Sequence, residues 1–301
     1  MKTVAVLGSV NMDMVLITNR IPQVGESIIG EKIEYFVGGK GANQAVAASR
    51  AGGKISFLGK VGDDAFGNRI LSHLGQEDVD LSQVEITKDS ATGIAGIFKL
   101  PEDNCIVAIP GANGLVDEDY VKKIEKKIKA SDILLLQLEV PIPTVKQVLK
   151  IAKEHQVLTI LNPAPYHEAA LEMLADVDYL TPNETEFAML LGEELIPEEE
   201  LDKRLLEWQE KHATKILLTR GKDGVSFVVE GKVETIPGYQ VTVADTTGAG
   251  DTFNGVFAAE LGMGRDLREA VRYANAAAGL SVTKLGAQTG MPTKAEIEAF
   301  I

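Results

Sequence analysis

Residues 131–219 alternate apolar runs with amphipathic segments, starting with Ile133-Leu134-Leu135-Leu136 and ending with Lys215-Ile216-Leu217-Leu218-Thr219. Further apolar runs lie at Val157–Leu161 and Val177–Leu180. Helical patterns separate these runs, at Pro143–Glu154, His167–Leu174, Glu184–Leu191 and Pro197–His212. Short, continuously apolar strands separated by helices are typical of a parallel sheet with helices on both faces. The segment therefore predicts an α/β fold built on a mostly parallel central sheet.

Three apolar runs nearer the amino terminus have no crossover helices, so we expect them to form a small antiparallel sheet. They are Ile28–Val37, Thr92–Leu100 and Cys105–Ile109, with a turn at Glu102–Asn104. The sequence contains no linker, internal repeat or low-complexity tract that would mark a second domain. We therefore expect one α/β domain over residues 1–301, with the small sheet formed by insertions at about 12–38 and 91–111.

The charge balance of the 301 residues restricts the possible partners. Lys and Arg number 30 and Asp and Glu number 44, which gives a formal net charge of −14. A chain this acidic lacks the basic field that binds nucleic acid or an anionic membrane surface. No apolar run approaches the roughly 18 residues that span a bilayer. The single cysteine, Cys105, fits a reducing compartment, so we expect a cytoplasmic protein.

Polar residues follow four of the predicted strands directly. In an open α/β sheet, ligands bind beyond the carboxyl ends of the strands, so four such clusters predict the rim of a cleft. Each cluster alone also fits a solvated loop with a helix cap. The clusters begin at Glu139, Asn162, Thr181 and Thr219.

Asn11 and Asp13 share one face of the first predicted strand, because side chains alternate at period 2. An amide beside a carboxylate can donate to and accept from adjacent hydroxyls, which suits a polyol ligand. A simple turn explains this pair equally well.

Glycine makes up 29 of the 301 residues, roughly a tenth against about 7% in average proteins. One glycine cluster is Gly38-Gly39-Lys40-Gly41-Ala42-Asn43-Gln44, which precedes an alanine-rich helix at Ala45–Ala51. Glycines before a helix let a ligand approach the backbone, and the free N–H groups of the helix start can meet it. Asn43 can point at the same ligand. A flexible loop is the alternative interpretation.

The second cluster is Asp245-Thr246-Thr247-Gly248-Ala249-Gly250-Asp251-Thr252-Phe253. The apolar spacing after it predicts a helix that begins near Gly250, so Gly248-Ala249-Gly250 would offer N–H groups to an anion. The segment matches neither the Walker A pattern nor the dinucleotide fingerprint. A carboxylate beside an anion hole fits a proton acceptor for a hydroxyl that attacks a phosphate, so Asp251 is the candidate base. A helix cap is the alternative role for Asp251.

These two segments resemble the two signatures of the ribokinase-type carbohydrate kinases. The likeness extends to nearly the whole chain, through Gly8–Asp13, Asn162–Pro165, Thr181–Glu186 and Gly286–Gln288. It implies a three-layer ribokinase-like α/β fold in which the small sheet is a lid, and a homodimer in which two lids pair. The Gly38–Gln44 segment looks most like that of members that phosphorylate D-ribose at the 5-hydroxyl. The implied cofactors are ATP, Mg²⁺ and a monovalent cation, usually K⁺.

The resemblance also implies residue roles. Asp251 would be the base, with Gly248, Ala249 and Gly250 as the anion hole. The remaining substrate-binding residues would be Asn11, Asp13, Gly39, Lys40, Asn43 and Glu139. The nucleotide site would further include Asn183, Glu186 (which helps to place Mg²⁺), Thr219, Gly221 and Asn275. The monovalent cation would be held by Asp245 and by carbonyls of Thr247, Ser281, Lys284 and Gly286, beside Gly290.

Two positions depart from the family pattern. Asn275 stands where relatives have a His that stacks on adenine, and Gly290 stands where a Ser can face the cation. The alternatives in function are a sister kinase for deoxyribose, fructose or a nucleoside, and a sugar-binding regulator without catalysis. Intact Asp251 and Gly248–Gly250 argue against the regulator. We expect the four histidines, His73, His155, His167 and His212, at the surface and without metal-ligand spacing.

Overall fold

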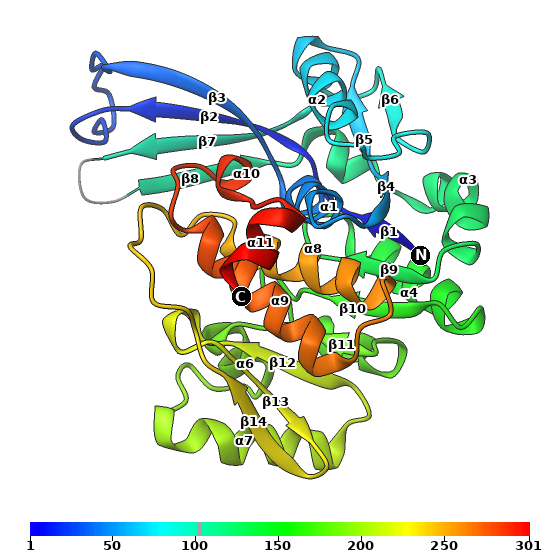
Figure 1. Ribbon diagram of the computed structural model, residues 1–301. Helices are drawn as coiled ribbons and strands as arrows, with labels where there is room; N and C mark the ends of the chain where they lie inside the picture. Colours follow the sequence, from blue (N-terminus) through cyan, green and yellow to red (C-terminus); the bar gives the residue numbers. More distant parts are fainter. Residues whose placement is uncertain (101–103) are drawn as a thin grey trace.

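The computed structural model describes residues 1–100 and 104–301, and most of its strands belong to one twisted sheet (Figure 1). From β4 through β1, β9, β10 and β11 to β12 all neighbouring strands run parallel, and β13 and β14 add an antiparallel edge. The strands in spatial order are β14 (Lys232–Ile236), β13 (Val225–Val229), β12 (Lys215–Thr219), β11 (Tyr179–Leu180), β10 (Leu158–Leu161), β9 (Ile133–Leu136), β1 (Thr3–Leu7) and β4 (Lys54–Leu58). The predicted mostly parallel sheet is therefore confirmed.

Helices cover both faces of this sheet and enclose two hydrophobic cores. Along β1, Val4 and Val6 pack into one core and Ala5 and Leu7 into the other, which explains why the strand is apolar at every position. The helices of the first core include α1 (Lys40–Arg50), α2 (Ala65–Gly75), α8 (Ala249–Gly262), α9 (Leu267–Ser281) and α11 (Lys294–Phe300). Those of the second include α3 (Glu118–Lys129), α4 (Ile142–Glu154), α5 (Ala170–Met173), α6 (Glu184–Leu190) and α7 (Glu198–Lys211). No helix in the described part of the chain combines the length and apolar character needed to cross a membrane.

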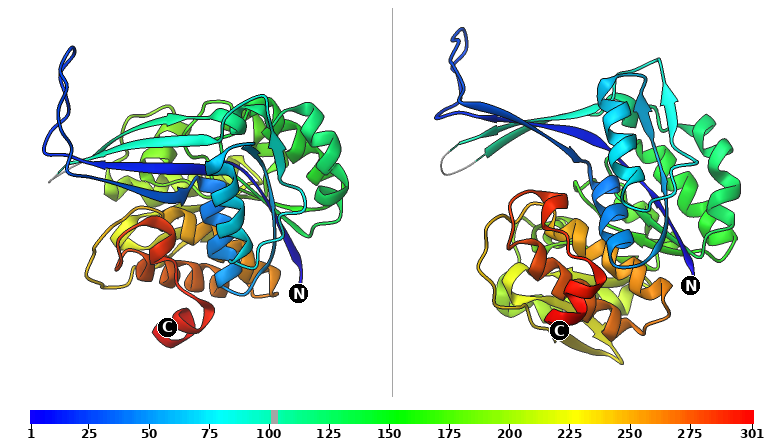
Figure 2. Two further views of the ribbon diagram at one scale, coloured as in Figure 1. Left: turned by 90° about the horizontal axis from the view of Figure 1, so that it is seen from above. Right: turned by 45° about the horizontal axis from the view of Figure 1, so that its top comes forward.

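A second sheet of four strands projects from the main body (Figure 2). This small sheet has the order β3 (Lys32–Gly38), β2 (Asn11–Ile17), β7 (Gly93–Lys99), β8 (Asn104–Ile109). The pair β7–β8 is antiparallel as expected. The sequence did not predict β2 in this sheet; β2 pairs antiparallel with β3 and parallel with β7. The turn expected at Glu102–Asn104 falls largely on residues 101–103, which lie outside the described residues. A further short parallel pair, β5 (Lys60–Gly62) and β6 (Glu85–Thr87), lies beside α2.

One buried amide ties the small sheet to the body. Asn113 lies in a short 3₁₀ helix (Gly111–Leu115); its Oδ1 accepts from the Val10 N–H at 3.0 Å and its Nδ2 donates to the Val10 carbonyl at 3.0 Å. Nδ2 also donates to Asn11 Oδ1 at 2.8 Å, where β2 begins. Gly93 starts β7 at the same place, and a Cβ there would lie 2.4 Å from both Asn11 Oδ1 and Asn113 Nδ2. The bases of β2 and β7 therefore meet at Asn113.

Candidate active site

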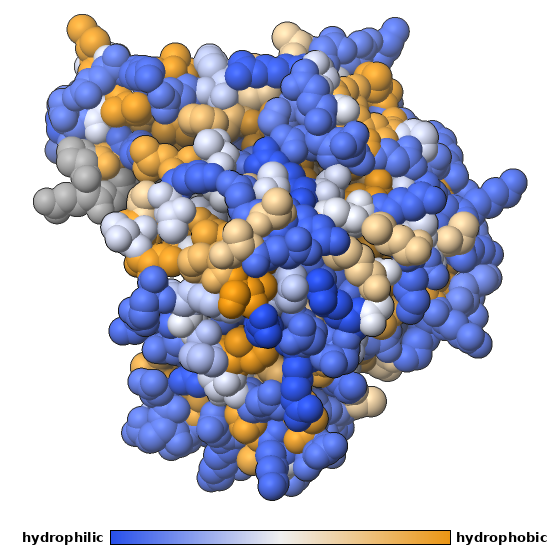
Figure 3. All heavy atoms as spheres, viewed as in Figure 1, coloured by the Kyte–Doolittle hydropathy of each residue, from blue (hydrophilic) through white to orange (hydrophobic). Residues whose placement is uncertain are grey.

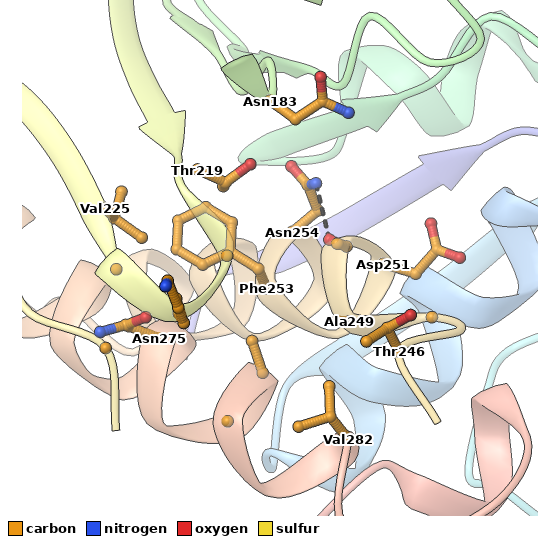
Figure 4. Close-up of a pocket in the computed structure, with 18 of the residues that line it drawn as sticks. Asn183, Thr219, Val225, Thr246, Ala249, Asp251, Phe253, Asn254, Asn275 and Val282 are labelled. Atoms are coloured by element: carbon orange, nitrogen blue, oxygen red, sulfur yellow. Dashed lines mark hydrogen bonds between the residues drawn. The ribbon is translucent and has the colours of Figure 1, made fainter. Parts of the chain in front are cut away.

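The carboxyl ends of the parallel strands meet at one edge of the main sheet, as the polar clusters predicted. The backbone N–H of Asn162 donates to Leu136 O at 2.9 Å, and that of Thr181 to Leu161 O at 3.0 Å. The Thr219 N–H likewise donates to Pro182 O at 3.0 Å. A cavity of about 580 Å³ opens at this edge, so the predicted cleft is present (Figure 4).

Asp251 and Asn275 line this cavity, and Figure 4 shows the ring of Phe253 between them. All of the nucleotide-site residues that the resemblance implied line it, and so do two of the implied substrate-binding residues, Lys40 and Asp251; the nucleotide-site residues are Asn183, Glu186, Thr219, Gly221, Gly248, Ala249, Gly250 and Asn275. The sequence analysis missed an apolar group that also lines it: Val225, Tyr239, Val243, Phe253, Ala278 and Val282. An apolar wall with a few polar groups is typical of a small-molecule site.

Asp251 lies in the first turn of α8 and is 8% exposed. Its Oδ2 accepts from Asn43 Nδ2 at 2.9 Å and its Oδ1 from Gln44 Nε2 at 3.0 Å. Burial raises the pKa of Asp251, although the Lys40 charge and the two amides oppose the shift. Gly248, not Asp251, is the N-cap of α8, so the helix-cap interpretation of Asp251 is wrong. The carboxylate is held by α1 and faces the cavity.

The first glycine cluster opens α1 earlier than the sequence analysis expected. The helix begins at Lys40 and not at Ala45, with Gly39 at φ 90° as its N-cap. Gly39 has no capping side chain, but the Glu139 carboxylate accepts from the Lys40 N–H at 3.2 Å and takes that place. A Cβ on Gly39 would lie 2.7 Å from Val10 Cα. The segment is therefore a closely packed helix start, and the flexible-loop interpretation is wrong.

Three carboxylates gather around Lys40 at this helix start. Although burial acts to lower it, the charges of Asp251, Glu139 and Glu186 raise the pKa of Lys40 above its ordinary value. Burial, together with the charges of Glu139 and Asp251, raises the pKa of Asp13 to about 7. These carboxylates can accept several hydroxyl donors from one ligand.

Asn11 and Asp13 belong to β2 and not to the first strand, which ends at Leu7. The turn interpretation of this pair is therefore wrong, and their common face is confirmed by the strand geometry. Asp13 lies beside β3, where a Cβ on Gly38 would be 2.1 Å from Asp13 Oδ2. The glycine thus leaves room for the carboxylate.

Replacing Asp13 with Asn is expected to stabilise the fold at pH 8. Because its folded-state pKa is about 7, Asp13 binds more protons folded than unfolded, and its contribution to stability falls as the pH rises from about 4 to 7. Asp13→Asn removes this loss and raises the free energy of unfolding by about 1–3 kcal/mol at pH 8, with no gain at pH 4. Urea unfolding at both pH values measures the difference. Asp202→Asn, at an exposed position on α7, is the control; an unchanged stability of Asp13→Asn at pH 8 contradicts the prediction.

Asn183 and Glu186 form the capping box of α6. Asn183 Oδ1 accepts from the Glu186 N–H at 2.8 Å, and Glu186 Oε2 accepts from the Asn183 N–H at 2.9 Å. The cap interpretation is correct for Asn183, and both residues also line the cavity. Burial raises the pKa of Glu186, against the hydrogen bond from Asn183 and the charge of Lys40.

The structure brings together most of the residues that the resemblance assigned to a cation. Asp245 Oδ1 accepts from the Thr247 N–H and Oδ2 from the Gly286 N–H, both at 2.9 Å. Although burial acts to raise it, the hydrogen bonds from Thr247 and Gly286 hold the pKa of Asp245 below its usual range. Gly290 packs closely against the Ser281 carbonyl, because a Cβ on Gly290 would lie 2.2 Å from the Ser281 carbonyl oxygen. Lys284 turns its side chain to Glu296. An ionised carboxylate is an oxygen ligand of the kind that a hard cation takes.

Some side chains do other work than expected. The Asn275 amide donates to Pro237 O at 2.8 Å and so secures the chain after β14. His73, expected at the surface, is half-buried, and its Nε2 lies 2.7 Å from Gln288 Oε1. Gln44 and Gln288 belong to the Gly38–Gln44 and Gly286–Gln288 segments, but the sequence predicted no function for either side chain. Within residues 1–100 and 104–301, no three His, Cys, Asp or Glu side chains form a metal site of their own.

Comparison with known proteins places this geometry in a family. The family described as pfkB family carbohydrate kinase matches residues 1–294 of the chain. The chain belongs to the PfkB family of carbohydrate kinases. This carbohydrate kinase is 40% identical to the ribokinase of Bacillus subtilis over 301 residues, which is 100% of both chains. It is 31% identical to the deoxyribokinase of Salmonella typhimurium, over 99% of this chain and 98% of the other.

The fold agrees with the family. The carbohydrate kinase superposes on the ribokinase of Arabidopsis thaliana complexed with ribose and ATP with a TM-score of 0.91 and 30% identity. The match covers 99% of this chain and 98% of that one. The expected ribokinase-like α/β fold and kinase class are therefore confirmed.

Proposed function

We propose that this kinase transfers the γ-phosphoryl group of ATP to the 5-hydroxyl of D-ribose. The observation that carries the proposal is the position of Asp251, a buried carboxylate on the cavity wall directly after the backbone of Gly248–Gly250. The Asn11, Asp13 and Glu139 side chains supply acceptors and donors for the sugar hydroxyls near the same carboxylate. The full-length likeness to ribokinases supports ribose as the sugar.

The chemistry follows from these positions. Asp251 accepts the proton of the sugar 5-hydroxyl while the oxygen of that hydroxyl attacks the γ-phosphorus of ATP. A new O–P bond forms to the sugar, and the bond between the γ-phosphorus and the β-phosphate oxygen breaks, leaving ADP. Each Asp251 oxygen accepts one amide hydrogen bond, so each keeps a lone pair free for the proton. The N–H groups of Gly248 and Gly250, at the positive end of α8, and the Lys40 ammonium meet the phosphoryl charge. The Ala249 N–H, which donates to the Thr246 carbonyl at 3.2 Å, would join them by leaving that long bond. A net charge of −14 makes such local donors necessary.

ATP and its Mg²⁺ would occupy the rest of the cavity. The adenine would lie against the apolar wall at Val225, Tyr239 and Val282, since Asn275 provides no ring to stack on it. Glu186 and Asn183 would orient water ligands of Mg²⁺, which when bound neutralises phosphate charge. The Asp245 carboxylate and the carbonyls near Gly286 would hold K⁺ behind the anion hole.

A single assay separates the candidate functions. We expect Mg²⁺-dependent ADP release with D-ribose at a kcat/KM at least tenfold above that with deoxyribose, fructose or a nucleoside, and stimulated by K⁺ over Na⁺. A preference for deoxyribose would make the chain a sister kinase. Binding of sugar without ADP release from any sugar would favour a regulator. If K⁺ does not stimulate ADP release, the result contradicts the proposed cation site.

We propose that the small sheet is a lid, formed by insertions at about 12–38 and 91–111 on a single α/β domain. A lid closes over the sugar and excludes water, which limits wasteful ATP hydrolysis. We also propose that two lids pair in a homodimer, because large apolar side chains are exposed on them, among them Phe36 at 41% and Ile106 at 57%. Figure 3 shows such apolar side chains over the small sheet at the upper left. ATP use and the free Cys105 support a cytoplasmic location.

Ile106→Lys is therefore expected to weaken the dimer at least tenfold. A charge placed in an apolar contact loses its hydration without gaining a partner. Light scattering over a concentration series measures the equilibrium. Leu195→Lys, which replaces a side chain that is 78% exposed away from the small sheet, should leave it unchanged. A monomeric unmodified protein contradicts the proposal.

A further inference from the structure

The two amides that hold Asp251 need a device that fixes their orientation. A side-chain amide has nearly the same shape after a 180° turn, but the turn exchanges its donor and acceptor ends. If Asn43 turned, its oxygen would face Asp251 Oδ2 in place of the N–H that now donates at 2.9 Å. An oxygen against a carboxylate is repulsive, so the orientation of Asn43 matters to the base.

Gln288 supplies that device. Its Nε2 donates to Asn43 Oδ1 at 2.9 Å, which leaves Asn43 Nδ2 to face Asp251. Its own Oε1 lies 2.7 Å from His73 Nε2, so a proton on that nitrogen fixes Gln288 in turn. Gln288 and Asn43 are each 6% exposed, so water does not compete for these bonds. Donors thus point in one direction along the series His73, Gln288, Asn43, Asp251.

The backbone that carries Gln288 is secured from α1 as well. Gln288 lies in α10 (Ala287–Gly290), and the Arg50 guanidinium donates to the Gln288 and Met291 carbonyls, the latter at 3.0 Å. Arg50 also pairs with Glu77 at 2.6 Å. Arg50 and Asn43 both belong to α1. Because Arg50 fixes the backbone of Gln288 to this helix, the Gln288 side chain stays at a constant position relative to the Asn43 amide.

The second amide is oriented in the same manner but deeper in the core. Gln44 Oε1 accepts from Gln137 Nε2 at 2.6 Å, and both side chains are 0% exposed. Each oxygen of Asp251 therefore accepts from an amide whose own oxygen is held by a glutamine. The repetition of this arrangement on both oxygens indicates that it serves the carboxylate.

We propose that Gln288 is a positioning residue for Asp251, which acts by keeping the Asn43 amide turned with its donor toward the carboxylate, and that His73 holds Gln288 in that orientation. The proposal rests on the proposed function of Asp251 as the base. The charged groups that face Asp251 are Lys40 of α1, Glu139 after β9 and Asp13 of β2, and none of them contacts Gln288. A change at Gln288 therefore reaches Asp251 through Asn43.

The test compares Gln288→Glu and Gln288→Met with the unmodified enzyme. Glutamate has the shape of glutamine but no donor, so Asn43 turns its N–H toward the introduced carboxylate and its oxygen toward Asp251. A carboxylate that loses a donated hydrogen bond has a higher pKa. The acidic limb of the kcat/KM profile should therefore move to higher pH by about one unit. Gln288→Met leaves Asn43 free to turn and should give a smaller shift in the same direction.

Controls separate positioning from folding. Thr289→Ala, at the exposed neighbouring position, should leave the profile unchanged. A purely structural role for Gln288 would lower the melting temperature and kcat without moving the acidic limb, and that result in the folded Met variant overturns the proposal. If Asp251→Asn is inactive while both Gln288 variants keep the normal profile, only this inference fails. If Asp251→Asn stays active, the proposed function fails first.

Discussion

Replacement of Asp251 by Asn is expected to lower kcat at least about 10²–10³-fold while the KM for the sugar changes little. Asparagine has the same shape and can still contact the sugar, but it cannot accept the proton of the attacking hydroxyl. Its NH₂ end would also meet the donors from Asn43 or Gln44, which costs one hydrogen bond. ADP release measures kcat, and calorimetric titration with the sugar measures binding separately.

The matched control for this variant is Asp266→Asn. Asp266 also lies at a helix start, as the N-cap of α9, where asparagine is an equally good cap. The control should keep kcat within a factor of two of the normal value and leave the free energy of unfolding unchanged. Half of the normal turnover in Asp251→Asn would eliminate the role of Asp251 as base.

Gly255→Ala is expected to destabilise the fold by about 2–4 kcal/mol, because overpacking between two helices forces them apart. Gly255 lies in α8 against α1, and a Cβ there would be 2.3 Å from Gln44 O and 2.8 Å from Ala47 Cβ. The closest atom is backbone, so no side-chain rotation relieves the contact. Because Gln44 holds Asp251, kcat should fall together with stability.

Urea unfolding measures the stability of this variant. Gly75→Ala is the control, since it also lies in a helix but a Cβ there meets nothing within 4 Å. That control should be neutral or stabilising by up to about 1 kcal/mol, because alanine restricts the unfolded chain. Equal stability of the two variants would show that α1 and α8 can separate without cost.

The sequence was most informative where one periodicity decides the structure. The apolar runs from Ile133 to Thr219 predicted the parallel strands, and the polar residues after them predicted the cleft, because both follow from local pattern and sheet geometry. The hairpin of β13 and β14 was missed. Its two-residue turn places Glu230 at φ 51° and Gly231 at φ 73°, and glutamate is an unusual residue for that conformation. The apolar wall of the cavity near Val225 was missed with it.

The site was predictable by residue type but not by partner. Asp251 and the glycines were found because few roles fit a carboxylate beside an anion hole. Gln44, Gln288 and His73 were not assigned, because their role depends on contacts across as many as 245 positions of sequence, as between Asn43 and Gln288. The early start of α1 at Lys40 depends in the same way on Glu139, a cap supplied from the loop after β9.

The small sheet meets the body at the base of β2 and β7 and again at the middle of β3, where the Tyr35 carbonyl accepts from Arg69 Nη2 of α2 at 3.1 Å. At the base of the sheet, Asn11 pairs with both Gly38 and Gly93, and these three residues form a row across the strands. Asn113 donates a hydrogen bond to Asn11 in this row. The seven residues of β2 extend about 20 Å from this row. If the proposed lid turns by about 10° about this row, its tip moves by about 3.5 Å. The proposed opening and closing of the sugar site therefore needs only a small change of angle at the base of the sheet.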